Sequence, residues 1–510
     1  MTIPLLERMG DWNPQLSREL KGRLKTRPVL MASGLSLLGQ AILIFYFLIQ
    51  LPTLNQSYYN QYCVRNGAEK CVAINWEYWW GDVSHAFYWI LPIVLLMGGT
   101  YMLISDLAQE KHRGTLDFIR LSPQSSHSFL IGKFLGVPVL IYLAVALSLP
   151  LDLWSTIASH AGWQWTLVFY AIQAASCCFF YSAASLYTFM GGSQGWIGAG
   201  AIAIYMWIFQ RILYLQPNLE WYWLPVGNNM AIQFGFLSFA YLLCTYWIWQ
   251  ALHRRFHNPS ASMFSKKQSY GATACFELVL FGFIVPQLTK APSEHALYHS
   301  VQLLTVFNLI WFLGLIAAMS HHRQVLQDWA RFSFAGKPGK QSKQSYNQRD
   351  WIWGEKSPAP VAIAINLAIA AAIFVPWILL WPAPEIPKLQ AIGGLIFSIS
   401  LVSIYAVIAQ LMLLMKTKKR ALWAFGSVCA AIGVPLILCI MLSPEPYKIP
   451  ILWLFYFPFA GITRASAADI VLAGLVQWVI LTTTSLTLIR ELHRAGESAM
   501  KAAIDAPRVS

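Results

Sequence analysis

The chain has 510 residues, of which 57% are apolar and only 11% carry a formal charge, and its mean hydropathy is +0.50. A water-soluble protein of this length cannot bury so many apolar side chains, so the composition excludes that class. Lipid cannot hydrogen-bond to exposed peptide groups, and long apolar runs satisfy these groups as helices. We therefore expect an all-α, polytopic integral membrane protein.

About twelve apolar segments are long enough to cross a bilayer. They are 29–51, 86–104, 135–153, 164–189, 196–215, 229–250, 270–286, 300–320, 360–381, 391–414, 421–442 and 469–489. The first of them follows a charged segment, and no small-residue cleavage site comes after it, so we interpret it as a retained span rather than a signal peptide.

The distribution of lysine and arginine predicts the orientation, because basic residues in short loops stay on the cytosolic side. With the N-terminus inside, 29 of the 36 basic residues lie in cytosolic segments and 7 lie outside. Both termini and the long basic loop 321–359 are therefore predicted to be cytosolic. The net charge of +14 follows from this topology and from attraction to anionic membrane lipids, and it requires no nucleic acid partner.

The cysteines agree with this orientation. Cys63 and Cys71 fall eight residues apart in the first outer loop, whereas the other cysteines lie inside predicted spans. An outer compartment permits disulfides, so we predict a Cys63–Cys71 bond. The alternative is two unpaired thiols.

A basic amphipathic helix is predicted at 13–25, directly before the first span. Asn13 and Pro14 form a good helix start. Leucines recur every four residues, and basic residues occupy the other faces. These positions are Leu16, Leu20 and Leu24, and Arg18 and Lys21. Such a helix is expected to lie in the inner membrane interface.

A charged island separates the second and third spans. It contains Glu110, Lys111, Gly114, Thr115, Leu116, Asp117, Leu121, Ser122 and Pro123, and is followed by Gly132 and Lys133. Leu116 and Ile119 have helical spacing, and Ser122-Pro123 ends the helix. A short helix joined to two spans can transmit a displacement to both of them.

This pattern resembles the type-2 ABC transporter permeases, the membrane subunits of drug, lipid and polysaccharide exporters. The resemblance covers residues 1–258 as one six-span unit. It implies that the helix around Gly114 to Leu121 is the coupling helix, which docks in a groove of a soluble ATPase subunit, and that 13–25 is the interfacial elbow helix. The segment 215–228, with Pro217 and Pro225, is similar to the family's short outer re-entrant helices.

The resemblance also implies the setting in which the chain works. The partners would be soluble ABC ATPase subunits and membrane lipids, with a homodimer or a partner permease left open. ATP would act only through the partner subunits. The location implied is the bacterial plasma membrane, with another internal membrane also open.

Residues 259–510 are expected to form a second six-span unit, which is either a degenerate repeat or an accessory membrane domain. We expect a second coupling helix at Lys416–Arg420, but this loop is too short to hold one. The loop 321–359 is then either a second cytosolic contact or a flexible linker, since it contains the segment Gly336–Ser342.

No catalytic or metal site is predicted. Gly336–Ser342 lacks the glycine spacing of a phosphate-binding loop, so the chain carries no ATPase motif of its own. Glu277 lies inside an apolar segment, where a carboxylate is costly, so it is a candidate for the translocation path, although a bond to a neighbouring helix also explains it. Two other functions stay open: a polytopic enzyme of lipid or glycan metabolism, and a membrane scaffold of permease ancestry that does not transport.

Overall fold

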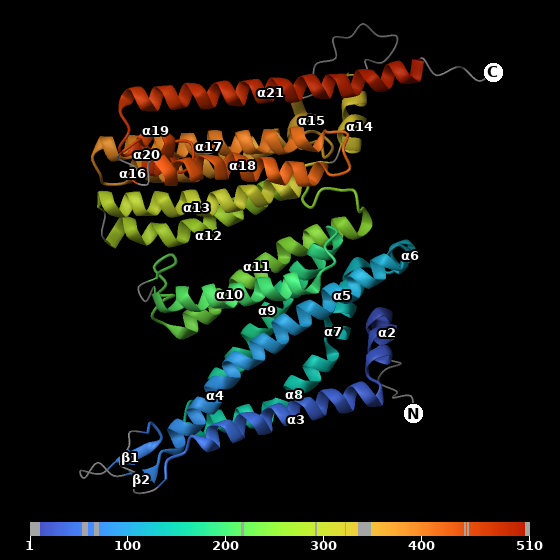
Figure 1. The fold of residues 1–510 in the computed structure, drawn as a ribbon, viewed down its shortest axis with the longest axis vertical. Helices are drawn as coiled ribbons and strands as arrows, with labels where there is room; N and C mark the ends of the chain where they lie inside the picture. The colour runs from blue at the N-terminus through green and yellow to red at the C-terminus, as the bar shows by residue number, and fades with distance from the viewer. Residues whose placement is uncertain are drawn as a thin grey trace, which may run out of the picture. The chain divides into compact units, whose positions relative to one another are not determined.

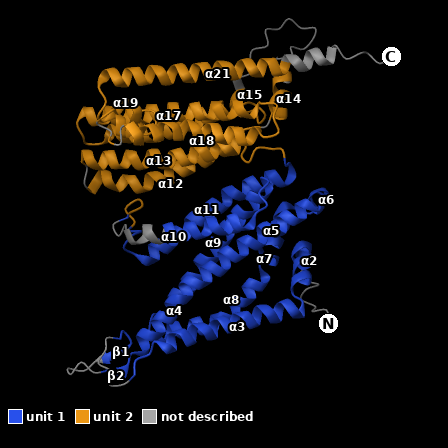
Figure 2. Ribbon diagram, viewed as in Figure 1, with its two compact units in different colours: residues 1–219, 225–259 blue, residues 220–224, 260–510 orange. Residues whose placement is uncertain are grey.

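The computed structural model describes residues 11–53, 60–65, 71–215, 219–290, 293–321, 323–334, 348–442, 445 and 448–504. Within these ranges the side chains of 65, 209–215, 332–334, 348–350 and 497–504 are not described. About 81% of the chain is helical, which makes the fold all-α. The chain divides into two compact units, residues 1–219 with 225–259 and residues 220–224 with 260–510 (Figure 2).

The first unit begins with a short helix and continues with long helices. In chain order its elements are α2 Pro14–Arg23, α3 Thr26–Ile49, β1 Cys63–Arg65, β2 Cys71–Ile74, α4 Trp76–Pro92, the π-helix η1 Ile93–Gly98, α5 Gly99–His112, α6 Thr115–Leu121, α7 Ser126–Gly136, α8 Val139–Ala158, α9 Trp163–Phe189, α10 Gly195–Leu215 and α11 Met230–His257. Helices α2, α6 and α7 lie at one end of this unit, and the two strands lie at the other (Figure 1).

The second unit has long helices side by side with short helices at both ends (Figure 1). Its elements are α12 Lys266–Lys290, α13 Glu294–Met319, α14 Arg323–Phe334, α15 Gln348–Trp353, α16 Ala359–Leu380, α17 Glu385–Leu413, α18 Arg420–Leu442, α19 Pro450–Trp453, α20 Pro458–Ile462 and α21 Ala467–Ile504.

Eleven helices among the described residues are long and apolar enough to cross a membrane, which identifies a multi-pass membrane protein. The remaining predicted segment, 196–215, forms α10, and the part of it whose side chains are described, Gly195–Ile208, is apolar. Helices α4, η1 and α5 together form one continuous span, Trp76–His112, which is longer than the predicted 86–104.

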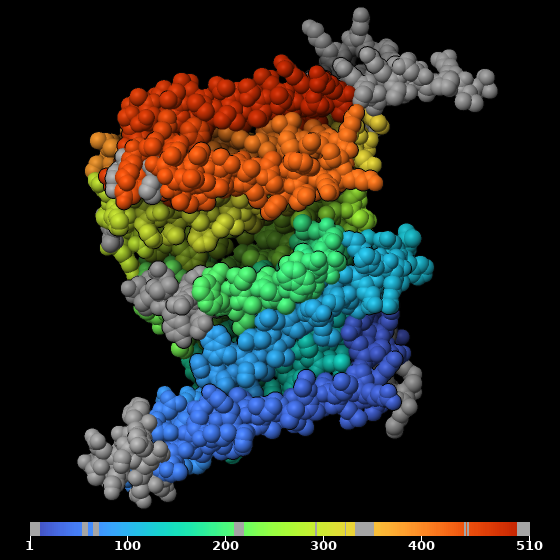
Figure 3. All heavy atoms as spheres, viewed as in Figure 1, coloured from blue at the N-terminus to red at the C-terminus, as the bar shows by residue number. Residues whose placement is uncertain are grey.

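Apolar side chains remain exposed on several long helices, as a lipid environment requires. On α21 they include Leu472, Leu475, Trp478 and Val479. Figure 3 shows this helix, in red, uncovered along the viewed face of its unit. Helix α3 likewise exposes Leu35 and Leu38. Hydrocarbon tails are as apolar as leucine, so these faces are stable only within a membrane.

A small antiparallel hairpin follows α3. Strands β1 and β2 pair with Cys63 opposite Ile74, and the Cys63 and Cys71 sulfurs are bonded at 2.18 Å. The hydroxyl of Tyr62 donates to Asp82 Oδ2 at 2.8 Å, which ties the hairpin to α4. The sequence predicts the cysteine pair but not the strands around it.

The two units share an order of elements. In the first, α6 and α7 stand between the second and third long spans. In the second, α14 and α15 stand at the same place, between α13 and α16. Placing the counterpart of the coupling helix at Lys416–Arg420 was therefore wrong, because that loop joins the fourth and fifth long helices of its unit, α17 and α18.

Loop 321–359 contains a packed helix. Helix α14 places Leu326, Trp329 and Ala330 in an apolar cluster with Val407 of α17 and with α21. The segment Gly336–Ser342 lies outside the described residues.

The structure corrects the expectation of short re-entrant helices at 215–228. Among the described residues 219–229 the chain forms a tight turn, with a bridge between Trp221 and Leu224 and positive φ at Tyr222 and Trp223. The Trp221 indole donates to the carbonyl of Val279 at 2.9 Å, so this turn packs on α12. Short helices occur instead in the second unit, where α19 and α20 precede α21.

Candidate functional site

Helix α6 begins at a glycine because of backbone geometry. Gly114 precedes it with φ of 72°, in the left-handed region that favours glycine. The Thr115 hydroxyl donates to the carbonyl of Glu110 at 3.1 Å, which fixes the sharp turn from α5 into α6. The helix ends at Leu121, and Ser122 is already extended. The element therefore lies where the sequence predicts it.

The two sides of α6 differ in burial. Leu116 is 1% exposed and Ile119 is 7% exposed, and both belong to the apolar core of the first unit. Phe118 and Leu121 are 77% and 88% exposed. One side of α6 is thus part of the core, and the other exposes two large apolar side chains.

Two residues expected to meet a partner do not face outward. Leu116 points into the core of its own unit, and Glu110 is buried beside Lys133. The other coupling residues are more accessible. Asp117 is exposed and pairs with Arg120 at 2.7 Å, and Lys111 is exposed and donates to the carbonyl of Thr188 at 3.5 Å. The side chains that α6 exposes are therefore Phe118, Leu121 and Asp117.

Helix α2 packs directly on α7 through two glycines. The Asn13 side chain accepts the N–H of Leu16 at 3.0 Å and caps the helix. A Cβ added to Gly132 would lie 2.8 Å from Gln15 Cβ, and one added to Gly136 would clash with the Cβ of Glu19. Only glycine permits this close approach of the two helices. The glycine of the Gly132-Lys133 pair is therefore explained by the packing of α7 on α2.

Helix α2 occupies most of the segment 13–25, in which an amphipathic helix is predicted. Leu16 and Leu20 are buried, and Lys21 is exposed. Leu24 lies beyond the last helical residue and is exposed, so it does not extend the buried stripe. Arg18 points to Glu110, with its Nη2 3.4 Å from the carboxylate, rather than only to the membrane surface.

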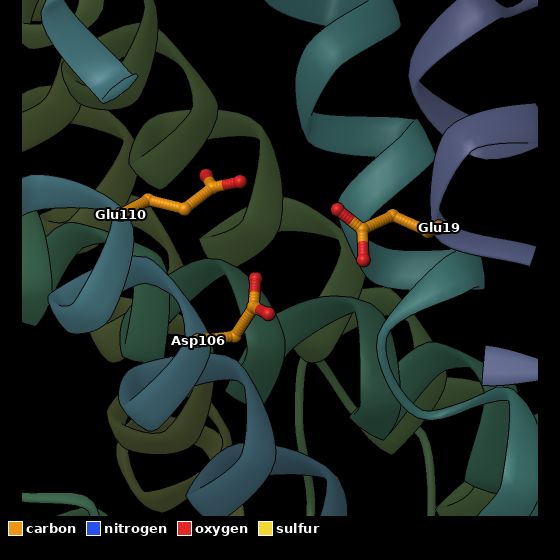
Figure 4. A group of neighbouring side chains, drawn as sticks. All are labelled: Glu19, Asp106 and Glu110. Atoms are coloured by element: carbon orange, nitrogen blue, oxygen red, sulfur yellow. The ribbon is translucent and has the colours of Figure 1, made fainter. Parts of the chain in front are cut away.

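A buried lysine joins three carboxylates beside α6. The Lys133 side chain is 0% exposed, and its Nζ lies 2.6 Å from Glu19, 2.7 Å from Asp106 and 2.8 Å from Glu110. Figure 4 shows these three acidic side chains turned toward one another, Glu19 from α2 and the other two from α5. The network therefore ties α2 and α5 to α7.

Two arginines complete the charge balance. Arg23 Nη2 lies 2.5 Å from Asp106, and its Nε lies 3.3 Å from Glu19. With Arg18 beside Glu110, three cations face three carboxylates. A buried charge is tolerated when it is paired and hydrogen-bonded in this way.

Burial and pairing act on the pKa values in opposite directions. For Glu19, burial raises the pKa, but the Lys133 ammonium and Arg23 outweigh it and hold the pKa below its ordinary 4.5. For Lys133, burial lowers the pKa, but Asp106, Glu110 and Glu19 hold it above its ordinary 10.5. Both groups are therefore charged at neutral pH.

The three carboxylates of Glu19, Asp106 and Glu110 lie as close together as the ligands of a metal ion. One oxygen each from Glu19, Asp106 and Glu110 lies within 4.8 Å of the others. Lys133 Nζ already bonds to all three residues, so the lysine ammonium is the cation that these oxygens hold.

Further contacts connect α6 and α7 to the rest of the unit. The Arg120 guanidinium lies 5.6 Å from the centre of the Phe189 ring at the end of α9. Ser126 Oγ and His253 Nδ1 are 2.6 Å apart, which joins α7 to α11. The short helices thus contact α2, α5, α9 and α11.

Glu277 lies apart from this cluster, on α12 in the second unit. Its side chain is fully buried, and Asn308 Nδ2 of α13 donates to its Oε2 at 3.3 Å. Among the described residues its Oε1 has no hydrogen-bond partner. The sequence leaves two explanations for Glu277, a place in the translocation path or a bond to a neighbouring helix. The structure contains the bond to the neighbouring helix.

Sequence reasoning missed the roles of Asp106, Arg23 and Lys133. One local signal was available, since Asp106 and Glu110 are four residues apart and lie on one face of α5. No local signal connects them to Glu19 or to Lys133, which is 114 residues from Glu19. No protein-family model, curated protein or solved structure matches this chain.

Proposed function

We propose that the chain is the permease subunit of an ATP-driven ABC transporter, an exporter, and that α6 is the helix that a separate soluble ATPase subunit contacts. The observation that carries the proposal is the exposure of Phe118 and Leu121 on a short helix whose other side is anchored in the core. The sequence pattern from Glu110 to Lys133 and the distribution of basic residues support it.

The proposed contact has suitable chemistry. Two exposed apolar side chains beside the exposed carboxylate of Asp117 fit a groove that is apolar at its centre and polar at its rim. The positive-inside distribution of lysine and arginine favours a cytosolic position for this end of the unit. A soluble partner in the cytosol can then reach α6 without entering the membrane.

In this proposal the Lys133 network carries the movement of α6 to the membrane-spanning helices. When nucleotide binding moves the partner, α6 moves with it. Because α6 and α7 contact α2, α5, α9 and α11, the displacement reaches several spans together. The three ion pairs of Lys133 and the glycine contacts of α7 resist separation of α7 from α2 and α5. The spans therefore tilt as one body and change access to the path.

Co-purification tests the proposal. A tagged chain is isolated from its native membrane, and soluble ATPases in the eluate are identified by mass spectrometry. We expect an ABC ATPase with the wild type, and its loss with Leu121→Asp. Val72→Asp, which alters an exposed apolar side chain on β2 at the other end of the unit, is the matched control. Equal recovery of the ATPase with Leu121→Asp would refute the coupling role of α6.

A further inference from the structure

A cavity of about 400 Å³ opens at the end of the second unit where α17 stops. Its wall carries four charged side chains from three segments. Arg323 begins α14, Lys416 follows α17, and Glu491 and Arg494 lie on α21. Leu414 lines the same cavity and packs against the apolar cluster of α14, α17 and α21. The charged wall is therefore built on a packed core.

Three cations in this wall face a single carboxylate. Glu491 pairs with Arg494 Nη1 at 2.9 Å. Among the residues that the structure describes, neither Arg323 nor Lys416 has an acidic partner. The cluster around Lys133 in the first unit differs, because it pairs three cations with three carboxylates. The cavity therefore leaves two positive charges unbalanced, which favours an anionic ligand.

The guanidinium of Arg323 is held in place from within its own helix. In the orientation that satisfies both polar atoms of the Gln327 amide, its oxygen accepts from Arg323 Nη2 at 3.0 Å and from Nε at 3.2 Å. A guanidinium has five N–H donors in a rigid fork, so three remain for a ligand. Phosphate oxygens suit this fork, because they accept two parallel N–H bonds.

Helix α21 changes from apolar to charged next to the cavity. Leu486 and Ile489 are 54% and 45% exposed. Glu491 and Arg494, which line the cavity, follow on the next turns. Exposed leucine and isoleucine are stable against hydrocarbon chains, whereas charged side chains are stable among headgroups and water. The cavity therefore lies at the boundary where the phosphates of phospholipids are found.

We propose that this cavity binds a phosphate-bearing anion, to which Arg323, Lys416 and Arg494 donate. Its volume is within the range of ligand pockets in proteins. The position favours the headgroup of an anionic phospholipid whose chains lie along α21 at Leu486 and Ile489. Binding requires no ATPase, so the site can be tested, and can fail, independently of the proposed transport function.

Native mass spectrometry of the purified full chain in detergent tests the site. The chain is titrated with phosphatidylglycerol and, separately, with phosphatidylcholine that has the same acyl chains. Phosphatidylglycerol carries a net negative charge and phosphatidylcholine carries none. For the wild type we expect phosphatidylglycerol to bind more tightly by up to about 25-fold, the value of two basic residues near an anionic membrane surface.

The basic loop after α17 provides a matched control. Arg323→Gln/Lys416→Gln removes the two unbalanced charges of the cavity, whereas Lys418→Gln/Lys419→Gln removes two charges from exposed lysines that do not line it. We expect the first variant to lose the preference for phosphatidylglycerol and the second to keep it. A preference that persists in the first variant, or is lost equally in both, would overturn the proposal. If the change at Arg323 prevents folding, Lys416→Gln is compared with Lys419→Gln, and the expected loss is about fivefold.

Inorganic phosphate distinguishes the two sources of the anion. Its binding to the delipidated chain is measured by titration calorimetry, with the same pair of double variants. A preference for phosphatidylglycerol that depends on Arg323 and Lys416 identifies a lipid headgroup as the ligand. Inorganic phosphate that binds with this dependence, while the two lipids bind equally, identifies a soluble phosphate compound. If neither probe depends on the cavity residues more than on the control lysines, the proposal is wrong.

Discussion

Lys133 of α7 and Glu19 of α2 form a buried ion pair, with Nζ 2.6 Å from Oε1. The pair lies next to the position where Gly136 lets α2 touch α7. The same ammonium also bonds to Asp106 and Glu110 of α5. One side chain thus joins the helix before the first span, the end of the second span and the helix that precedes the third.

Removing this ammonium should destabilise the protein. Lys133→Met keeps most of the side-chain volume but leaves three carboxylates facing one another. Breaking one partner of a buried ion pair costs about 3–5 kcal/mol, so the thermal midpoint of the purified chain should fall clearly. Lys111→Met, at an exposed lysine on α5, should change stability by less than about 0.5 kcal/mol. Equal midpoints for both variants would show that the network contributes little.

The contribution of the network should depend on pH in a defined way. The pKa of Glu19 is lowered, so its contribution is present above the ordinary 4.5 and is lost as pH falls through the lower folded value. The pKa of Lys133 is raised, so its contribution is present below the ordinary 10.5 and is lost as pH rises through the higher folded value. The difference in thermal midpoint between wild type and Lys133→Met should be constant between these limits and shrink beyond them. A steep change near pH 7 would contradict these shifts.

The contact between α2 and α7 should tolerate only glycine at position 136. Gly136→Ala places a Cβ against Glu19 and forces α2 away, which we expect to cost about 1–3 kcal/mol, the range for overpacking. In Gly22→Ala the new Cβ meets nothing within 4 Å. Because alanine favours helices, this control should be as stable as the wild type or slightly more so. Unfolding midpoints in detergent distinguish the two variants.

The Cys63–Cys71 bond predicts a labelling pattern. A membrane-impermeant maleimide, applied to intact cells, should label these cysteines only after reduction. The double variant Cys63→Ser/Cys71→Ser is the control, because it should show no gain on reduction. The other six cysteines lie in α9, α11, α12 and α18, within the membrane-spanning helices. Labelling of Cys63 without reductant would exclude the bond in cells.

Local signals were sufficient to find α6 but not the side chains that it exposes. Glycine before a helix and Ser-Pro after it act on neighbouring residues, so the chain alone locates the helix at 115–121. Leu116 and Leu121 are the same residue type on the same short helix. Only the tertiary packing of the unit, in which Leu116 joins the apolar core and Leu121 does not, decides that the first is buried and the second exposed. This packing cannot be predicted from spacing.

The ion network could not be predicted for a similar reason. In the sequence, Arg18, Arg23 and Lys133 are part of the positive-inside distribution, which assigns them to lipid headgroups and water. The structure gives them specific carboxylate partners, up to 114 residues away along the chain. In the second unit, the short loop 416–420 joins the fourth and fifth long helices, so it is not the counterpart of α6 and α7. The order of the long helices, rather than any motif, shows that α14 and α15 occupy the place of α6 and α7.

Site-specific crosslinking at position 121 tests the central claim most directly. Leu121 is replaced by a photoreactive benzoyl-phenylalanine in the native host, and irradiated membranes are analysed by mass spectrometry. Position 72 on β2 carries the same group as a control. We predict that the group at 121 captures a soluble protein with a Walker A motif and that the group at 72 does not. An adduct at 121 that contains no ATPase, with the chain inserted and stable, would contradict the assignment of α6 as the coupling helix.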